Sequence, residues 1–399
     1  MNICGIVSEY NPFHKGHSFH IAQTREKLGT DCGIVCCMSG DFVQRGEAAV
    51  FPKHARADAA VRCGADLVLE LPIPWALSSA EGFARGAVAT LAATGAVNHL
   101  SFGSECGDVK FLEKTARVLL HPDMDGLVRA ELQQGVSYPV ARQRAAEKLT
   151  GKPMEILSSP NDLLAIEYIK TILHFDFPLT PVAIPRVGAE HDSRVESAMP
   201  SASLLRQKLA DGADISVYIP EEARSVFQRE TMQGRGPILP NDMERMILSR
   251  LRMLKLENFE KLSDASEGLG NRLYRAVKTQ PSLDAVLAEA KTKRYAFSRL
   301  RRMIMCAALG ITSEDSMGYP PYIRVLAAGE RGLQILKTMQ ETAWLPVITK
   351  PAAVRNLDAK AQSVFQLGAD AADFYALCYP ALAERAGEKD YKTSPVIVR

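Results

Sequence analysis

The sequence predicts an α/β protein that begins with a doubly wound parallel sheet and ends in a mostly helical segment. Three observations support this prediction. Short apolar runs alternate with helical patterns, the first apolar run leads directly through a polar loop into a helix, and clear β runs become scarce after about residue 215. Alternating strands and helices are typical of a parallel sheet, which binds ligands beyond the carboxyl ends of its strands.

Five apolar runs predict buried strands: Ile3–Val7, Gly33–Met38, Asp66–Leu71, His99–Phe102 and Leu179–Ile184. Helical patterns accompany them at Gly16–Lys27, Phe51–Cys63, Glu81–Ala93, Val109–Leu120, Leu127–Leu149, Asn161–Leu173 and Ser203–Ala210. Later helices are expected at Met243–Leu256, Ser282–Lys293, Ser298–Leu309 and Gly332–Glu341. A chain of 399 residues is long enough for two domains, and we place them at 1–215 and 216–399.

The composition is that of an ordinary globular protein. Hydrophobic residues make up 47% and charged residues 24% of the chain, and the formal charge is +2. A charge this small does not by itself indicate a nucleic-acid binder, so any basic surface must be local. The sequence contains no apolar run of roughly 20 residues, the length that spans a bilayer, and no secretory pattern near residue 1. We therefore expect no membrane partner and a cytoplasmic location.

The eight cysteines predict buried free thiols rather than disulfides or a zinc site. No two of them form a CxxC pair, and most lie in apolar runs. The spacing of Cys32, Cys36 and Cys37 is compatible with a metal site, but this stretch has the pattern of a core strand. We expect no protein-bound metal there.

The most informative motif is His14-Lys15-Gly16-His17, which follows the first predicted strand and begins a helix. The start of a helix attracts phosphates, and two imidazoles beside a bare glycine backbone suit a triphosphate. Imidazoles in this position stabilise charge that develops when the α-phosphate of ATP is attacked and pyrophosphate leaves. The alternative is a pair of surface histidines at a helix start.

Four further polar clusters follow predicted strands or begin predicted helices: Ser39–Glu47, Phe102–Glu105, Ser158–Asp162 and Arg186–Arg206. Each has a simpler interpretation. The first is compatible with a solvated loop, Gly103 with a turn, Asn161 and Ser203 with helix caps, and Arg206 with a solvated helix face. Position at the edge of the sheet favours ligand binding for the first and last clusters, whereas for Gly103 and Asn161 both interpretations stay open.

Together these motifs resemble the bacterial tRNA(Met) cytidine acetate ligase family of the nucleotidylyltransferase superfamily, which shares a Rossmann-like fold with class I aminoacyl-tRNA synthetases. The resemblance rests on Glu9-Tyr-Asn-Pro-Phe-His-Lys-Gly-His17, Gly40-Asp-Phe-Val-Gln-Arg-Gly-Glu47, Phe102-Gly-Ser-Glu105 and Ser159-Pro-Asn161. The weakest match is Ala202-Ser-Leu-Leu-Arg206, where the superfamily commonly has Ser-Thr-x-x-Arg.

The resemblance implies a ligase that uses ATP as a substrate, with Mg²⁺ accompanying it, to activate acetate as acetyl-adenylate. The acetyl group would then pass to N4 of the wobble cytidine of elongator tRNA(Met). The implied ATP-site residues are Val7, Ser8, Glu9, Tyr10, Asn11, Pro12, Phe13, His14, Lys15, Gly16, His17, Ser18, Phe19, His20, Gly103, Asn161 and Arg186. His14 and His17 would be catalytic. From loop position alone, we expect Asp41, Gln44 and Arg45 near acetate and cytidine, with Asp41 and Arg45 as further catalytic candidates.

A local basic segment in the second half is a candidate RNA-binding surface. Lys291–Arg302 holds six basic residues in twelve, with Tyr295 and Phe297 among them. Arg245, Arg250, Arg252 and Lys255 are possible extensions. The alternative is a solvated helix face with both rings in the core.

Two other functions remain open from the sequence. One is a small-molecule nucleotidylyltransferase without an RNA partner, which would not need the second half of the chain. The other is a non-catalytic RNA-binding protein that keeps a nucleotide-binding fold and releases no pyrophosphate. The sequence gives no oligomeric state.

Overall fold

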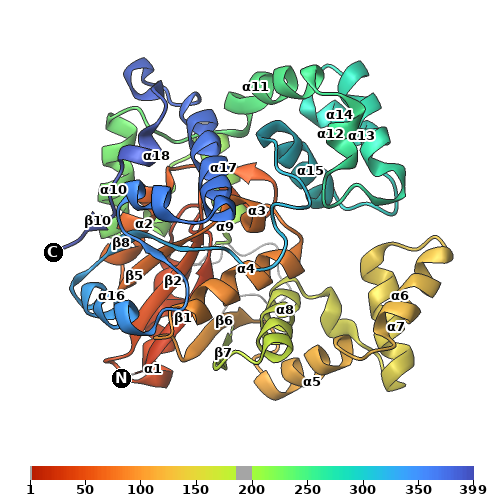
Figure 1. Cartoon of the computed structure of the whole chain (residues 1–399), viewed down its shortest axis with the longest axis horizontal. Helices are drawn as coiled ribbons and strands as arrows, with labels where there is room; N and C mark the ends of the chain where they lie inside the picture. The colour runs from red at the N-terminus through yellow and green to blue at the C-terminus, as the bar shows by residue number, and fades with distance from the viewer. Residues whose placement is uncertain (1, 186–199) are drawn as a thin grey trace.

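The computed structural model describes residues 2–185 and 200–399 and contains the predicted alternation of strands and helices (Figure 1). The first part contains β1 (Ile3–Ser8), α1 (Lys15–Leu28), β2 (Gly33–Ser39), the small hairpin β3 (Phe42–Val43) and β4 (Glu47–Ala48), α2 (Lys53–Arg62), β5 (Leu67–Leu71), α3 (Ile73–Ala76), α4 (Ala80–Ala93), β6 (His99–Ser104), α5 (Val109–Leu119), α6 (Met124–Gln133), α7 (Tyr138–Thr150), α8 (Pro160–Phe175) and β7 (Thr180–Pro185). The predicted helix at Leu127–Leu149 is wrong in one respect: it is two helices, separated by a turn at Gly135, whose φ is +83°.

All five predicted strands lie in one sheet with the order β10-β8-β5-β2-β1-β6-β7. The pairs β5–β2, β2–β1, β1–β6 and β6–β7 are parallel, so the carboxyl ends of these five strands share one edge. Strand order reverses at β1, which lies between β2 and β6. In open α/β sheets, this reversal point is where ligands bind. The predicted fold class is confirmed.

Helices cover both faces of the sheet, which explains why its central strands β1 and β2 are almost entirely apolar. All seven residues of β2 are buried. Along this strand, Val35 and Cys37 join the core beneath α4, whereas Ile34, Cys36 and Met38 join the core beneath α1 and α2. This alternation is the side-chain period of an extended strand between two helical layers.

The second half is mostly helical but returns to the sheet near the end of the chain. Its elements are α9 (Ala202–Ala210), α10 (Glu221–Met232), α11 (Pro240–Met253), α12 (Leu256–Glu260), α13 (Leu269–Thr279), α14 (Leu283–Ala290), α15 (Phe297–Leu309), β8 (Ile323–Ala328), α16 (Glu330–Thr342), β9 (Val347–Ile348), α17 (Ala359–Ala376), α18 (Lys389–Lys392) and β10 (Val396–Ile397). Helices α11–α15, the helical cluster, lie together (Figure 1) and share a core to which β3, α3 and α17 also contribute.

Strand β8 is the main difference from the expected helical second half. It pairs antiparallel with β5, and β9 and β10 pair with it in turn. The division into 1–215 and 216–399 stays a prediction, but the sheet draws strands from both segments. The last part of the chain therefore adds β8, β9 and β10 to the sheet, while α17 packs against the helical cluster.

The cysteines agree with the expectation of free thiols. Cys4, Cys32, Cys36, Cys37 and Cys378 are buried and reduced, and Cys63, Cys106 and Cys306 are also free. Burial raises the pKa of Cys36 to about 12, so this thiol is protonated and packs as a small apolar group. The Cys32–Cys37 stretch is the core strand β2.

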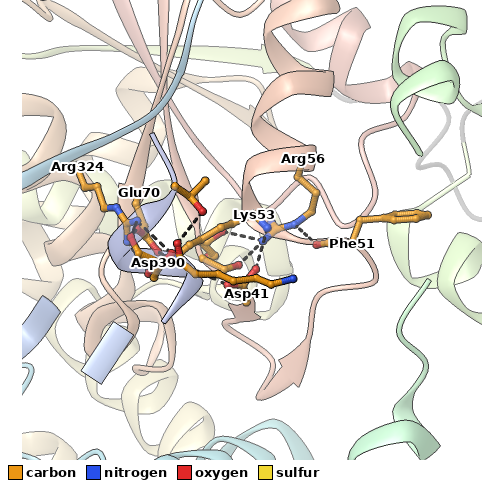
Figure 2. A network of polar contacts seen from close by, with 11 residues as sticks. Asp41, Phe51, Lys53, Arg56, Glu70, Arg324 and Asp390 are labelled. Carbon is orange, nitrogen blue, oxygen red and sulfur yellow. Dashed lines mark hydrogen bonds and ion pairs between the residues drawn. The ribbon is translucent and has the colours of Figure 1, made fainter. Parts of the chain in front are cut away.

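A buried network of charges attaches the end of the chain to the sheet (Figure 2). Lys53 Nζ on α2 lies 2.8 Å from Glu70 Oε1 and 2.7 Å from Asp390 Oδ2. Arg324 on β8 donates to both Asp390 carboxylate oxygens, at 2.7 and 3.1 Å, and pairs with Glu70 at 3.0 Å. Since each charge has a partner of opposite sign, the network satisfies groups that would otherwise be costly to bury.

Replacing Asp390 with Asn is expected to destabilise the protein by about 3 kcal/mol, because Lys53 and Arg324 lose a buried counter-charge. Burial favours the neutral carboxyl, but Lys53 and Arg324 outweigh it and hold the pKa of Asp390 below its usual value. The stabilisation from Asp390 is therefore present above pH ~4 and is lost as the pH falls below that value. Urea unfolding across this pH range measures it.

The matched control is Lys392→Ala, which breaks an exposed 3.1 Å pair with Glu388 in the same short helix. It should change the unfolding free energy by less than ~0.5 kcal/mol. Equal destabilisation by the two variants would contradict a special role for the buried network.

Candidate active site

The His14–His17 motif lies at the start of α1, directly beyond the carboxyl end of β1. His14 is the N-cap residue, and its Nδ1 accepts a hydrogen bond of 3.0 Å from the Gly16 N–H. In return, His17 Nδ1 accepts a 3.2 Å hydrogen bond from the His14 N–H. The two ring centroids are 3.8 Å apart. The predicted pairing of two imidazoles at a helix start is therefore present.

These two hydrogen bonds determine the tautomer of both rings. A backbone N–H is only a donor, so each Nδ1 is an unprotonated acceptor. In the neutral rings, the proton is therefore on Nε2, which becomes the donor on the side away from the helix backbone. Two Nε2–H donors beside the positive end of α1 are suited to phosphate oxygens.

Gly16 is required by the close approach of the His14 ring. A Cβ atom at residue 16 would lie 2.8 Å from His14 Cε1 and 3.0 Å from its Nδ1. Real carbon atoms do not approach this closely, so any side chain here would displace the ring. The glycine of the motif is thus explained by the hydrogen bond that orients His14.

The loop before the motif packs around His17. The rings of Tyr10 and Phe13 lie 4.8 and 5.4 Å from the His17 ring. Tyr10 is buried with a φ of 46°, a conformation that non-glycine residues rarely adopt, and its hydroxyl lies 3.2 Å from Cys36 Sγ. Asn11 Oδ1 accepts a 2.8 Å hydrogen bond from the Val50 N–H. This packing fixes the loop that carries His14.

The other residues of the predicted ATP segment have mixed positions. Lys15 is exposed at the start of α1, whereas Val7, Ser8, Ser18 and Phe19 are partly buried and Pro12 is buried. His20 lies 2.8 Å from Ser101 Oγ on β6, so it connects α1 to the neighbouring strand. A direct nucleotide contact by each of these residues stays a prediction.

Arginines from two distant segments meet beside the motif. Arg45 follows β3 and donates a 3.2 Å hydrogen bond to Ser203 Oγ on α9. Arg206 donates to the same oxygen at 3.3 Å, and its other terminal nitrogen donates to the Asn11 carbonyl at 3.1 Å. Ser201, not Ser203, caps α9, so the cap interpretation of Ser203 is wrong. Ser203 and Arg206, the two ends of the weakly matching Ser-x-x-Arg segment, therefore lie beside the loop that carries the His14–His17 motif.

Glu47 of β4 connects this arginine pair to the helical cluster. Its Oε2 lies 3.5 Å from Arg206, and its Oε1 accepts a 2.7 Å hydrogen bond from Arg301 on α15. Next to it, Gly46 has a φ of +74°, and a Cβ there would lie 2.4 Å from the Arg302 backbone nitrogen. The β3–β4 hairpin thus contacts the arginine pair beside the His14–His17 motif on one side and α15 on the other.

Glu9 and Gln44 join the first and second motifs. Glu9 Oε1 accepts a 2.9 Å hydrogen bond from the Gln44 N–H, and Gln44 Nε2 donates to the Ser78 carbonyl at 3.4 Å. Burial raises the pKa of the Glu9 carboxyl, and the Gln44 N–H and nearby arginines oppose that rise. Gln44 therefore lies beside the loop that carries the first motif, and its proximity to acetate and cytidine stays a prediction.

Asp41 has structural partners of its own. Its Oδ1 accepts a 2.8 Å hydrogen bond from the Lys53 N–H, and its Oδ2 lies 3.9 Å from Lys53 Nζ (Figure 2). The side chain is buried, and burial raises its pKa. A catalytic role for Asp41 stays a prediction, and its observed contacts position the start of α2.

Arg56 is a residue that the sequence analysis missed. It is fully buried and donates to the backbone carbonyls of Glu9, Ser39, Gly40 and Phe51 (Figure 2). The Glu9 and Gly40 carbonyls directly follow β1 and β2, so one guanidinium joins the two loops that carry the first and second motifs. A single arginine inside an alanine-rich helix gives no signal of this role.

Gly103 and Asn161 lie on two segments that are joined by reciprocal hydrogen bonds. Asp162 Oδ1 accepts from Ser104 Oγ at 2.5 Å and from the Glu105 N–H at 2.9 Å. Glu105 in turn accepts from the Asp162 N–H at 2.8 Å and from the Asn161 side chain. The end of β6 and the start of α8 are thus fixed together beside β1. Since Ser159 is the N-cap residue, the cap interpretation of Asn161 is wrong.

Arg186, the last predicted ATP-site residue, lies outside the described residues.

The basic segment 291–302 divides into two parts. Tyr295 is buried, with the Arg299 guanidinium 5.1 Å from its ring centroid, whereas Phe297 is 47% exposed. Arg302 pairs with Asp264 at 3.1 Å, and Arg301 pairs with Glu47. Stacking of an RNA base on the buried Tyr295 ring is therefore not supported. The cations of this segment that remain available to phosphate groups are Lys291, Lys293 and Arg294.

Among the described residues, no group of three or more His, Cys, Asp or Glu side chains is arranged to hold a metal ion. Within the same residues, every helix is too short or too polar to cross a bilayer.

Comparison with known proteins gives one consistent result. The profile of the HIGH Nucleotidyl Transferase family matches residues 1–390. The chain is 34% identical to the tRNA(Met) cytidine acetate ligase of Thermosipho melanesiensis, over 100% of this chain and 99% of that protein. It is 35% identical to the protein of the same name from Thermotoga maritima, over 98% and 99% of the two chains.

Solved structures agree over the whole chain. The crystal structure of Thermotoga maritima TmcAL bound with alpha-thio ATP matches with a TM-score of 0.93 and 34% identity, covering 100% of both chains. The apo structure of the same protein matches with a TM-score of 0.94.

Replacing Gly16 with Ala is expected to weaken ATP binding about tenfold or more, because the new Cβ displaces the His14 ring and its hydrogen bond to the residue 16 N–H. Calorimetric titration with a non-hydrolysable ATP analogue measures the affinity. The matched control is Gly126→Ala on α6, where a Cβ would meet no atom within 4 Å. Unchanged affinity in the Gly16 variant would contradict the proposed arrangement of the His14 ring.

Proposed function

The chain belongs to the tRNA(Met) cytidine acetate ligase family, and on that basis we propose that it activates acetate with ATP and acetylates a cytidine of elongator tRNA(Met). The observation that carries this proposal is the pair of oriented imidazoles at the start of α1, beside the Arg45–Ser203–Arg206 cluster. The full-length match to relatives with this name and to an ATP-analogue-bound structure supports it.

In the first step, a carboxylate oxygen of acetate attacks the α-phosphorus of ATP. An oxygen–phosphorus bond forms, the bond to the β-phosphate bridge breaks, and pyrophosphate leaves with the electron pair. His14 and His17 donate from Nε2 to the phosphate oxygens as negative charge develops on them. Arg206 holds the departing phosphates, since a guanidinium binds phosphate through paired donors. The products are acetyl-adenylate and pyrophosphate.

In the second step, the N4 amine of the wobble cytidine attacks the acetyl carbonyl carbon. The new carbon–nitrogen bond forms as the bond to AMP breaks, and the amine loses one proton. Gln44 and Arg45 lie on the hairpin next to α15, so they are our candidates for contacts to the acetyl group and the cytidine. The adenosine part would lie along Gly103 and Asn161.

Mg²⁺ would enter with ATP. Since magnesium in nucleotide sites is held mainly by phosphate oxygens and water, it does not require a protein cage of carboxylates. We propose that the triphosphate, rather than a dedicated set of side chains, supplies most of its ligands.

The small-molecule alternative is less well supported. It does not require the helical cluster, yet the chain matches proteins named as tRNA ligases over essentially their whole length. A tRNA substrate is consistent with a cytoplasmic location. The decisive experiment is incubation with labelled acetate, ATP and bulk tRNA. Label in RNA together with released pyrophosphate supports the proposal, and either product missing contradicts it.

Replacing Arg206 with Lys is expected to slow acetate-dependent exchange of pyrophosphate into ATP by roughly tenfold to a hundredfold. Lysine keeps the charge but cannot reach Asn11, Ser203 and Glu47 together. The control is Gln207→Ala on the same helix, because the Gln207 side chain bonds only to Asp211 among the described residues. If both variants exchange at the parent rate, Arg206 is not part of the phosphate site.

Replacing Arg45 with Ala is expected to lower the rate of tRNA acetylation at least tenfold, because its guanidinium contacts Ser203 and the hairpin that carries it contacts α15 through Glu47. Labelled acetate incorporated into tRNA measures this rate. Arg45→Lys keeps one donor and should recover part of the activity. Acetylation at the parent rate by the Ala variant would remove Arg45 from the site.

A further inference from the structure

A hollow lies in the helical cluster, lined by residues other than those of the proposed ATP site. It has a volume of about 790 Å³ and is lined by one face of α13, by residues 292–295 and by Gly135 of the α6–α7 turn. A hollow of this size is within the range that encloses small ligands. Nothing in the ATP-site assignment uses it.

The lining of this hollow is strongly basic. Arg272, Arg275, Lys293 and Arg294 contribute cations, and among the described side chains Glu289 is the one acidic residue that lines it. All four cations are exposed. Among the described residues, none of the four forms an ion pair with a carboxylate. Unpaired cations around a concavity are the arrangement that binds phosphate groups.

Arg272 is held in place by neutral partners. Its Nε donates to the Ala290 carbonyl at 3.0 Å, and a terminal nitrogen donates to the Glu289 carbonyl at 2.6 Å. These carbonyls end α14, so they orient the guanidinium without neutralising its charge. Arg275 lies one turn further along α13, on the same face of the helix.

The other wall comes from the first half of the chain. The turn at Gly135 approaches Arg294 so closely that a Cβ on residue 135 would lie 3.2 Å from its Nη2. The hollow is therefore a pocket between the α6–α7 turn and the α13–α14 pair, rather than a flat surface patch. Figure 1 shows these two pairs of helices on the same side of the molecule.

The pocket is connected to the active site through α15. Residues 292–295 line the pocket and lead into α15, and Arg301 follows the first residue of this helix by roughly one turn. Arg301 pairs with Glu47 of the hairpin that carries Arg45. An RNA chain entering the active site near α15 would thus pass close to the pocket.

We propose that this pocket binds an unpaired nucleotide of the RNA substrate, close in sequence to the cytidine that is modified. This inference rests on the proposed function and extends it by naming the partner surface. A concave basic pocket admits a single extruded nucleotide with its phosphates, whereas a duplex presents its phosphates on a convex surface. The pocket therefore selects loop RNA.

The test uses the full-length protein with Arg275, Lys293 and Arg294 changed together to Ala. The probe is the anticodon stem-loop of elongator tRNA(Met), and the same stem as a blunt duplex is the comparison. The dissociation constant of the stem-loop should rise about tenfold or more, and the slope of log K against log salt should fall by about 2, as for the loss of three phosphate contacts. Duplex binding should change little.

Two measurements separate a binding defect from a folding defect. Acetate-dependent pyrophosphate exchange needs no RNA and should equal the parent rate, whereas the KM for tRNA should rise with kcat nearly unchanged. The matched control is Lys337→Ala, an exposed lysine on α16, which packs on the sheet. It should bind the stem-loop like the parent.

Stem-loop affinity and salt slope equal to those of the parent would overturn the pocket proposal, as would an equal loss with the duplex. Absence of acetylation by the parent protein would overturn the proposed function instead. Because the binding measurement requires no catalysis, the two failures are distinguishable. Crosslinking of a photoreactive stem-loop to residues 268–295 provides a second, independent measurement.

Discussion

The reciprocal hydrogen bonds at the start of α1 are the constraint on which the active site depends. His14 accepts from the Gly16 N–H, and His17 accepts from the His14 N–H. Each bond satisfies a donor that a helix start leaves unpaired, and each fixes the orientation of one imidazole. The same hydrogen bonds therefore cap the helix and orient the two imidazoles, and Gly16 is required for both.

The surrounding structure holds this helix start against the ends of the neighbouring strands. Arg56 collects the carbonyls that follow β1 and β2, and the Glu105–Asp162 pair joins the end of β6 to α8. Both arrangements are buried or partly buried, so they are insulated from competing water. The loops of the site are consequently positioned by these buried hydrogen bonds of Arg56, Glu105 and Asp162. Rigid loops of this kind reduce the reorganisation needed as charge develops on the phosphates.

The sequence was informative where one local pattern determines structure. Continuous apolar runs located the five parallel strands, and a strand followed by a polar loop located the start of α1. The prediction from sequence failed where a residue's partner lies far away in the chain. Strand β8 contains Arg324, whose charge argues against a buried strand until Asp390, 66 residues away, supplies the counter-charge. Arg56 was missed, and the pairing of Asp162 with the Glu105 segment was not foreseen, because these partners become neighbours only after folding. The Leu127–Leu149 prediction failed because its apolar spacing continues through the turn at Gly135.

The β3–β4 hairpin explains why the helical cluster and the ATP site belong to one enzyme rather than to two adjacent modules. Gly46 lies against the backbone of α15 with no room for a side chain, so the hairpin packs directly on that helix. Glu47 then shares its carboxylate between Arg206 and Arg301. A carboxylate shared in this way couples the two arginines, because a stronger contact with one arginine weakens the contact with the other. In a double-mutant cycle, the effects of replacing Arg206 and Arg301 on the rate of acetate-dependent pyrophosphate exchange should therefore be non-additive. They should become additive when Glu47 is replaced by Gln.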